Sequence, residues 1–343
     1  MAEPLRVIDF GVSSPLRSQT LWHAVAYGVS AGAPATLSFV RPAAPYVCLG
    51  YHRNMDEVDT DYCRANGLPV FRRMVGGGPV YLDSNQLFFQ ICVRVESLPP
   101  GRHQAMRTLL EPAVAAFRAL GVPAALDAGG EICVEGKKIC GHGAGQIEDA
   151  VIVCGNLIEQ FDHERAARVL AMAEATQREE TLALMRRFVG STPVDPGAFR
   201  STMTASYRDA LSLGGREEEG ALTGLEHEAL VELDERFTSR PWLDGPRPPS
   251  VGSVAPRVRQ VKVRAGVCTF AVEGHGALVT AGVVDGVLER VHLFDGALNG
   301  SRQRAEHALV GVPVNDAARV LSGFGDPGRR LAALLASLEP ARL

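Results

Sequence analysis

The chain has 343 residues, of which 46% are hydrophobic and 22% charged, a balance typical of a globular protein rather than a disordered or fibrous one. This length predicts two domains. The formal net charge of −4 argues against non-specific nucleic-acid binding, because neutralising a phosphate backbone needs a strong cationic excess. No apolar run approaches the roughly 20 residues that cross a bilayer, and the first residues lack an export signal. We therefore expect a cytoplasmic protein with neither a membrane nor a nucleic-acid partner.

The first part of the chain predicts alternating strands and helices. Strands are expected at residues 5–10, 36–40, 46–49, 68–72, 80–81, 86–95, 122–126, 131–134 and 150–158. Helices are expected after a cap at Ser18, at 56–65 and at 102–120. The pattern then turns helical and charged, with helices at 163–172, 180–188, 196–213 and 224–236. This alternation predicts a mixed sheet flanked by helices.

A second, smaller unit follows a proline-rich stretch. Residues 241–256 have the composition of a linker. Beyond them, strands are expected at 258–263, 268–273, 277–283 and 287–293, followed by helices at 303–309, 316–321 and 327–338. The sequence therefore predicts an α+β protein with a main domain over residues 1–240, a linker over 241–256 and a small α+β domain over 257–343.

The cysteines point to neither disulfides nor a metal site. All seven, at positions 48, 63, 92, 133, 140, 154 and 268, are scattered, and no Cys-x-x-Cys pair occurs. We expect reduced, buried thiols and no firm metal site.

The most specific segment covers residues 72–83, Arg-Arg-Met-Val-Gly-Gly-Gly-Pro-Val-Tyr-Leu-Asp. Three consecutive glycines let a backbone approach a ligand closely and turn its amides toward an anion, and paired arginines offer fork-shaped donors for a carboxylate or phosphate. A tight turn with solvent-facing arginines fits the same pattern.

A second segment, residues 130–146, reads as strand, turn, strand and then a flexible glycine-rich loop. Only three of the 35 basic residues are lysine, and two of these are the adjacent Lys137 and Lys138. Where arginine replaces lysine so widely, a retained lysine is a candidate for a role that needs a compact point charge. Strand alternation places Glu131 and Lys138 where they can face one cavity, although a hairpin with solvated lysines fits as well.

Together these segments resemble the lipoate-protein ligases and related octanoyltransferases, which share a catalytic fold with the biotin-protein ligases. The family's loop reads Arg-Arg-x-Ser-Gly-Gly-Gly-Ala-Val-Tyr-His-Asp, and its lysine stands in Gly-Lys-Lys-Val-x-Gly-Ser-Ala. Residues 45–52 resemble the strand that ends beside the family's ligand site, and residues 155–158 resemble the strand that closes it. The resemblance covers about residues 5–240, and the last hundred residues resemble the accessory domain of the bacterial ligases.

The resemblance implies roles for particular residues. The residues that it places around an acyl-adenylate are Arg73, Gly76, Gly77, Gly78, Pro79, Val80 and Tyr81. Lys138 is implied as the catalytic residue, bridging the acyl carboxylate and the α-phosphate. Glu131 and Asp83 are candidates for binding Mg²⁺ or orienting the reacting amine.

The implied function is that of a lipoate-protein ligase. Such an enzyme uses ATP and Mg²⁺ to activate lipoate, or octanoate, as acyl-AMP and passes the acyl group to a specific lysine. The implied acceptors are lipoyl domains of 2-oxoacid dehydrogenase E2 subunits or the glycine cleavage H protein.

Two alternatives remain open. One is a transferase that carries octanoyl or lipoyl groups from acyl carrier protein or another carrier through a cysteine thioester. Where that branch has its cysteine, this chain has none in the run 124–127, and Cys133, Cys140 and Cys154 are the substitutes. The other is a catalytically inert acyl- or nucleotide-binding paralogue, because Val75 replaces the family's serine, Leu82 replaces its histidine, and residues 141–145 form an unusual glycine-rich run. A third departure, Glu131 in place of an Asn-Asp pair, preserves a carboxylate. The C-terminal domain favours the ligase, since single-step transferases generally lack it.

Overall fold

A computed structural model describes residues 4–211, 217–245 and 257–336. The chain forms two compact units: an N-terminal unit of residues 1–162 and 190–246, and a C-terminal unit of residues 163–189 and 247–343. The sequence places a single boundary near residue 240, whereas the structure groups the helical segment 163–189 with the C-terminal sheet. Most of the expected linker, residues 246–256, lies outside the described residues.

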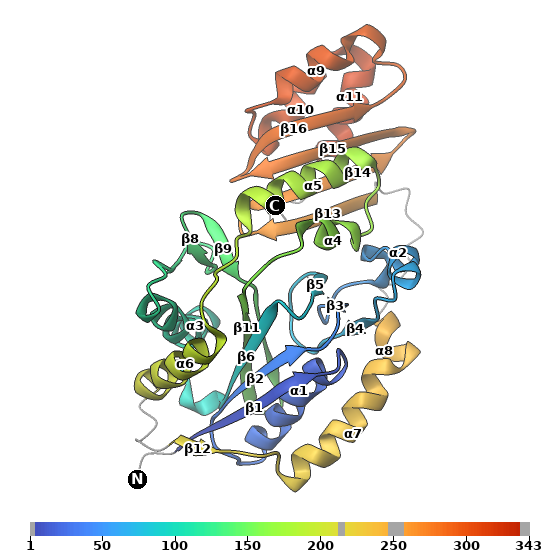
Figure 1. Cartoon of the computed structure of the whole chain (residues 1–343). Coiled ribbons are helices and arrows are strands. Elements are labelled where there is room, and N and C mark those ends of the chain that lie inside the picture. Colours follow the sequence, from blue (N-terminus) through green and yellow to red (C-terminus); the bar gives the residue numbers. More distant parts are fainter. Residues whose placement is uncertain (1–3, 212–216, 246–256, 337–343) are drawn as a thin grey trace. The chain divides into compact units, whose positions relative to one another are not determined.

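The N-terminal unit is organised around a mixed six-stranded sheet (Figure 1). Its strand order is β10 (His142–Ile147), β11 (Ala150–Ile158), β6 (Gln86–Arg94), β2 (Thr36–Pro42), β1 (Leu5–Ser13) and β12 (Glu217–Glu219). β1 runs parallel to β2 and β12, and the pairings from β2 to β10 are antiparallel. These strands confirm the predicted mixed sheet.

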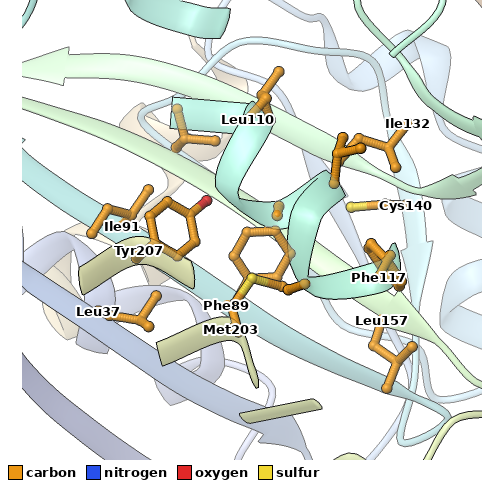
Figure 2. Packing of buried hydrophobic residues seen from close by; sticks show 14 of the residues in the cluster. Leu37, Phe89, Ile91, Leu110, Phe117, Ile132, Cys140, Leu157, Met203 and Tyr207 are labelled. Carbon is orange, nitrogen blue, oxygen red and sulfur yellow. The ribbon is translucent and has the colours of Figure 1, made fainter. Parts of the chain in front are cut away.

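The largest hydrophobic cluster of this unit lies on one face of the sheet, under helices α3 (Arg102–Ala119) and α6 (Pro196–Ala210), which pack against each other. Figure 2 shows Phe89 and Ile91 of β6 packed with Phe117, Met203 and Tyr207. These are alternate residues of β6, so the strand's remaining side chains face the opposite side. That opposite face carries α1 (Arg17–Ser30), which packs against α7 (Gly224–Thr238).

Two small sheets carry the segments that the sequence singles out. One has the order β4 (Val70–Arg72), β3 (Tyr46–Leu49), β5 (Val80–Leu82), and the other is β7 (Ala125–Leu126), β8 (Ile132–Val134), β9 (Lys137–Cys140). The short helices α2 (Thr60–Ala65) and α8 (Arg240–Asp244) complete the unit.

Two local predictions need correction. The glycine-rich run after Cys140 is not a flexible loop, because residues 142–147 form β10 and pair in full register with β11. Ser18 does not cap α1: it lies inside the helix, where its hydroxyl donates to the Pro15 carbonyl at 2.8 Å and lies 2.9 Å from the Tyr46 hydroxyl. Gly143 and Gly145 are required because β10 packs closely against Val75, not because their backbone needs unusual torsion angles. A Cβ on Gly145 would lie 2.9 Å from Val75.

The C-terminal unit is an antiparallel sheet covered on both faces. Its strands are β13 (Arg257–Arg264), β14 (Val267–Gly274), β15 (Ala277–Val284) and β16 (Val287–Phe294), and its helices are α4 (His163–Arg168), α5 (Ala175–Phe188), α9 (Arg302–Leu309), α10 (Val314–Ser322) and α11 (Gly325–Ala336). α5 covers one face, with its Thr181 hydroxyl 2.7 Å from that of Thr269. The other face packs on α9, α10 and α11. This arrangement confirms the expected small α+β unit.

No helix among the described residues is both long enough and apolar enough to cross a membrane.

Candidate functional site

The Arg73 side chain holds the glycine loop, residues 76–78, through hydrogen bonds to its carbonyl groups. Its guanidinium is buried and donates to the carbonyl oxygens of Gly76 at 2.8 Å, Gly78 at 3.0 Å and Cys48 at 3.0 Å. In a trans peptide the C=O and the following N–H point in opposite directions. Because the Gly76 carbonyl is turned inward to Arg73, the Gly77 N–H points outward. The guanidinium thus fixes the loop and also places a positive charge under it.

Gly50 and Gly77 make the tightest backbone contact of the site. A Cβ on Gly50 would lie 1.9 Å from the Gly77 carbonyl oxygen, and Gly77 itself has a positive φ of 104°. The N–H groups of Gly77 and Gly78 donate to no acceptor among the described residues, and both glycines are exposed. The loop therefore presents two consecutive backbone donors, an arrangement that suits an anion.

The imidazole ring of His23 binds the backbone just before the glycine loop. Its Nδ1 lies 2.6 Å from the Gln19 carbonyl oxygen, and its Nε2 accepts the Met74 N–H at 2.9 Å. These two contacts require the neutral Nδ1–H tautomer. Burial lowers the pKa of His23 to about 3, so the ring stays neutral across the physiological range. Sequence reasoning missed this residue, because a histidine on the apolar face of a helix resembles an ordinary core side chain.

Arg72 is a structural residue rather than a ligand donor. Its fully buried guanidinium donates to the carbonyls of Gly50, Tyr51, Arg53, Trp242 and Leu243, and the Trp242 indole N–H returns a bond to the Arg72 carbonyl. The arginine therefore ties α8 to the backbone that supports the glycine loop. Both Arg72 and Arg73 are buried, so this segment is not a tight turn with solvent-facing arginines.

Val75 and β10 form the floor beside the loop. Val75 is fully buried, and the Gly76 N–H donates to the Ala144 carbonyl at 3.3 Å. A Cβ on Gly143 would lie 3.3 Å from the Gly76 carbonyl oxygen. The valine thus fills an apolar site against the two glycines of β10, where the family pattern has serine.

Lys138 and Glu131 meet at the β8–β9 hairpin. The Lys138 Nζ lies 2.5 Å from the Glu131 Oε2, and the side chains are 18% and 7% exposed. The neighbouring Lys137 is exposed, as strand alternation requires. β9 continues through Gly141 into β10, on which the glycine loop rests. The structure thus brings together the carboxylate and the ammonium that the sequence places on one side of the hairpin.

The remaining predicted residues lie around β5. Asp83 is buried and accepts the Asn85 N–H at 3.0 Å, so this carboxylate closes the turn between β5 and β6. Tyr81 is buried, whereas Val80 is exposed and Pro79 half-buried. No group of three His, Cys, Asp or Glu side chains that could hold a metal ion occurs within the described residues.

Two of the three candidate thiols, those of Cys140 and Cys154, are poor nucleophiles in this environment. Burial raises the pKa of Cys140 to about 12 and also raises the pKa of Cys154. Cys133 is buried as well, and its Sγ donates to the Asp127 carboxylate at 3.6 Å.

Comparison with known proteins decides the family. The model of the lipoyl protein ligase A/B catalytic domain matches residues 16–192, just over half of the chain. The chain belongs to this family. It is therefore an enzyme of the group that contains lipoate-protein ligases and octanoyltransferases, as the glycine and lysine segments indicate.

Both branches of the family occur among the relatives. The chain is 27% identical to octanoyltransferase LipM of Symbiobacterium thermophilum over 233 residues, which are 61% of this chain and 84% of that protein. It is 30% identical to lipoate-protein ligase LplJ of Bacillus subtilis over 122 residues, 35% of this chain and 36% of that protein.

Solved structures confirm the lipoate ligase fold. The bipartite lipoate protein ligase of Thermoplasma acidophilum, described with its E2 lipoyl domain, superposes with a TM-score of 0.64 at 24% identity and covers 73% of this chain and all of that one. LipL1 of P. falciparum in complex with lipoate has a TM-score of 0.57 at 10% identity and covers 93% of this chain and 94% of that one. The second likeness extends over both units of this chain.

Proposed function

We propose that this family member is an ATP-dependent lipoate-protein ligase. It activates lipoate, or octanoate, as acyl-AMP and transfers the acyl group to a lysine of a lipoyl domain. The observation that carries the proposal is the Lys138–Glu131 pair, with its short Nζ–Oε2 contact of 2.5 Å on a hairpin whose strand leads into the floor of the glycine loop.

Lys138 supplies the charge that the first half-reaction needs. The acyl carboxylate attacks the α-phosphorus of ATP, the bond to the β-phosphate oxygen breaks, and pyrophosphate leaves. A mostly buried ammonium beside the reacting oxygens offsets the negative charge that accumulates there. Glu131 holds the Lys138 ammonium in place before the substrates arrive.

The glycine loop supplies donors for the phosphate. The N–H groups of Gly77 and Gly78 are free of acceptors among the described residues, and the Arg73 charge lies beneath them. A backbone cradle of this kind fits a nucleotide phosphate. Mg²⁺ usually reaches such sites on phosphate oxygens with one or two carboxylates, so Glu131 and Asp83 are the protein groups that would meet it.

In the second half-reaction the lysine amine of the acceptor attacks the acyl carbonyl, AMP leaves, and an amide forms. Lys138 then polarises the mixed anhydride. Lipoyl domains of 2-oxoacid dehydrogenase E2 subunits and the glycine cleavage H protein are the proposed acceptors. The description of the Thermoplasma ligase with an E2 lipoyl domain supports the first of these.

The second candidate is a cysteine-dependent octanoyltransferase, and the likeness to LipM favours it. That mechanism needs a thiolate, yet burial raises the pKa of Cys140 and Cys154. The match to LipM also leaves 39% of this chain uncovered, and the chain carries a C-terminal unit that resembles the accessory domain of the bacterial ligases. These two observations favour the ligase.

Exchange of labelled pyrophosphate into ATP tests the proposal, because this exchange occurs only through the reversible formation of acyl-AMP. We expect exchange that depends on lipoate and on Mg²⁺ and that is lost in Lys138→Arg. Absence of exchange by the wild-type protein, with either lipoate or octanoate, contradicts the ligase assignment.

A further inference from the structure

A row of polar side chains crosses the main sheet on the face that carries the glycine loop. Strand register places Ser38 opposite Gln90, Gln90 opposite Cys154, and Cys154 opposite Gly143. Residues directly opposite one another share a face of the sheet. A Cβ on Gly143 would lie 3.6 Å from the Cys154 Sγ and 3.5 Å from Val75, so this face is the one against the loop.

Gln90 has one half of its amide satisfied. Its Oε1 accepts the Ser38 hydroxyl at 2.8 Å. Its Nε2 has no partner among the described residues, although the side chain is only 1% exposed. Ser38 lies on β2, on one side of β6, and Cys154 lies on β11, on the other side.

The neighbours of Gln90 on this face of β6 are the apolar residues Phe88 and Cys92. One cluster on the same face contains Cys92, Ile152 and Val75, and a second contains Val40 and Phe88. Met74, two residues before the glycine loop, packs against both clusters. A buried donor in such surroundings is costly when it is left unpaired, and it rarely persists in a protein without a use.

We propose that Gln90 determines the acyl specificity of the proposed ligase, its Nε2 donating a hydrogen bond to an acceptor atom of the bound acyl chain. This inference rests on the proposed function, because it takes lipoate as the substrate. The dithiolane sulfurs of lipoate are weak acceptors, whereas a saturated hydrocarbon chain has none. A site with an unpaired buried donor therefore favours the sulfur-bearing acid and disfavours chains of the same shape without an acceptor.

The experiment uses titration calorimetry of the full chain with two acids of nearly equal shape. One is lipoate, and the other is its carbocyclic analogue, in which methylene groups replace both sulfurs. The wild-type protein should prefer lipoate. Gln90→Met removes the donor at similar volume and should reduce this preference by about three- to tenfold, the worth of one net hydrogen bond.

Two further variants separate specificity from stability. Ser38→Ala combined with Gln90→Met leaves no hydroxyl without its acceptor and should show the same reduced preference. Ile91→Val alters the opposite face of β6, within the core of Figure 2, and should leave the preference unchanged. An unchanged preference in both Gln90 variants overturns the inference while leaving the ligase proposal intact. Failure of the wild-type protein to bind either acid overturns both, and the pyrophosphate exchange then fails as well.

Discussion

At the scale of single residues, the two adjacent lysines provide a matched pair. Lys138→Arg should reduce acyl transfer by about 10²- to 10³-fold, because a planar guanidinium cannot occupy the place of a compact ammonium between a carboxylate and a phosphate. Lys137→Arg should keep near-normal activity, since Lys137 is exposed on the other side of the strand. Rates of acceptor modification and thermal melting of both variants provide the check. Near-normal transfer by Lys138→Arg removes this residue from the mechanism.

His23 predicts a specific pH dependence. Its pKa is lowered from 6.5 to about 3 on folding, so the unfolded chain binds its proton first as the pH falls. The stability that the neutral ring provides is complete above pH 6.5 and is lost progressively from there toward pH 3, by an amount on the order of a few kcal/mol.

The comparison that isolates this effect is between wild type and His23→Gln, whose amide can still accept the Met74 N–H. Denaturant unfolding at several pH values should show that stability falls more steeply with acid in the wild type than in the variant. Equal slopes between pH 6.5 and 4 indicate that His23 does not cause the dependence.

At the scale of elements, the glycine loop depends on close backbone packing. Gly50→Ala should displace the loop, because the new Cβ would lie 1.9 Å from the Gly77 carbonyl oxygen. We expect loss of adenylate binding by at least about tenfold, since the Gly77 amide no longer points to the phosphate. Gly224→Ala, with nothing within 4 Å of its Cβ, is the control. Calorimetry with a non-hydrolysable lipoyl-adenylate analogue measures the effect, and equal affinities for the two variants contradict it.

Hydrophobic period and turn residues predict the elements themselves well. The strand at 36–40 and the helix at 102–120 recur as β2 and α3, and Asp285 and Gly286 adopt the positive φ values of a tight hairpin. β10 could not be predicted, because its glycines have no side-chain period and the strand exists through pairing with β11. The grouping of residues 163–189 with the C-terminal sheet is likewise a tertiary property.

Only part of the candidate site can be predicted from the sequence, for the same reason. Spacing alone places Lys138 beside Glu131, because both lie on one hairpin. The inward turn of Arg73 and the His23–Met74 bond depend on residues distant in sequence, so no local pattern signals them.

At the scale of the whole molecule, a buried ion pair joins segments that are far apart in the sequence. The Arg6 guanidinium donates to both carboxylate oxygens of Glu226, which is fully buried at the first turn of α7. Glu226→Gln should destabilise the protein by roughly 3–5 kcal/mol, because it leaves an uncompensated buried arginine.

Glu232→Gln on the exposed side of the same helix is the matched control and should change stability by less than about 0.5 kcal/mol. Urea unfolding of the two variants tests the difference. Similar stabilities would show that the pair contributes nothing beyond a surface charge.

The most direct test of ATP-dependent ligation is intact-mass analysis of a lipoyl domain incubated with this protein in two parallel reactions. One contains lipoate and magnesium ATP, and the other contains octanoyl acyl carrier protein without ATP. A ligase adds one lipoyl group to the domain in the first reaction and leaves it unmodified in the second. Octanoylation of the domain without ATP, together with an octanoyl adduct on a cysteine of this protein, would contradict the ligase and establish the transferase.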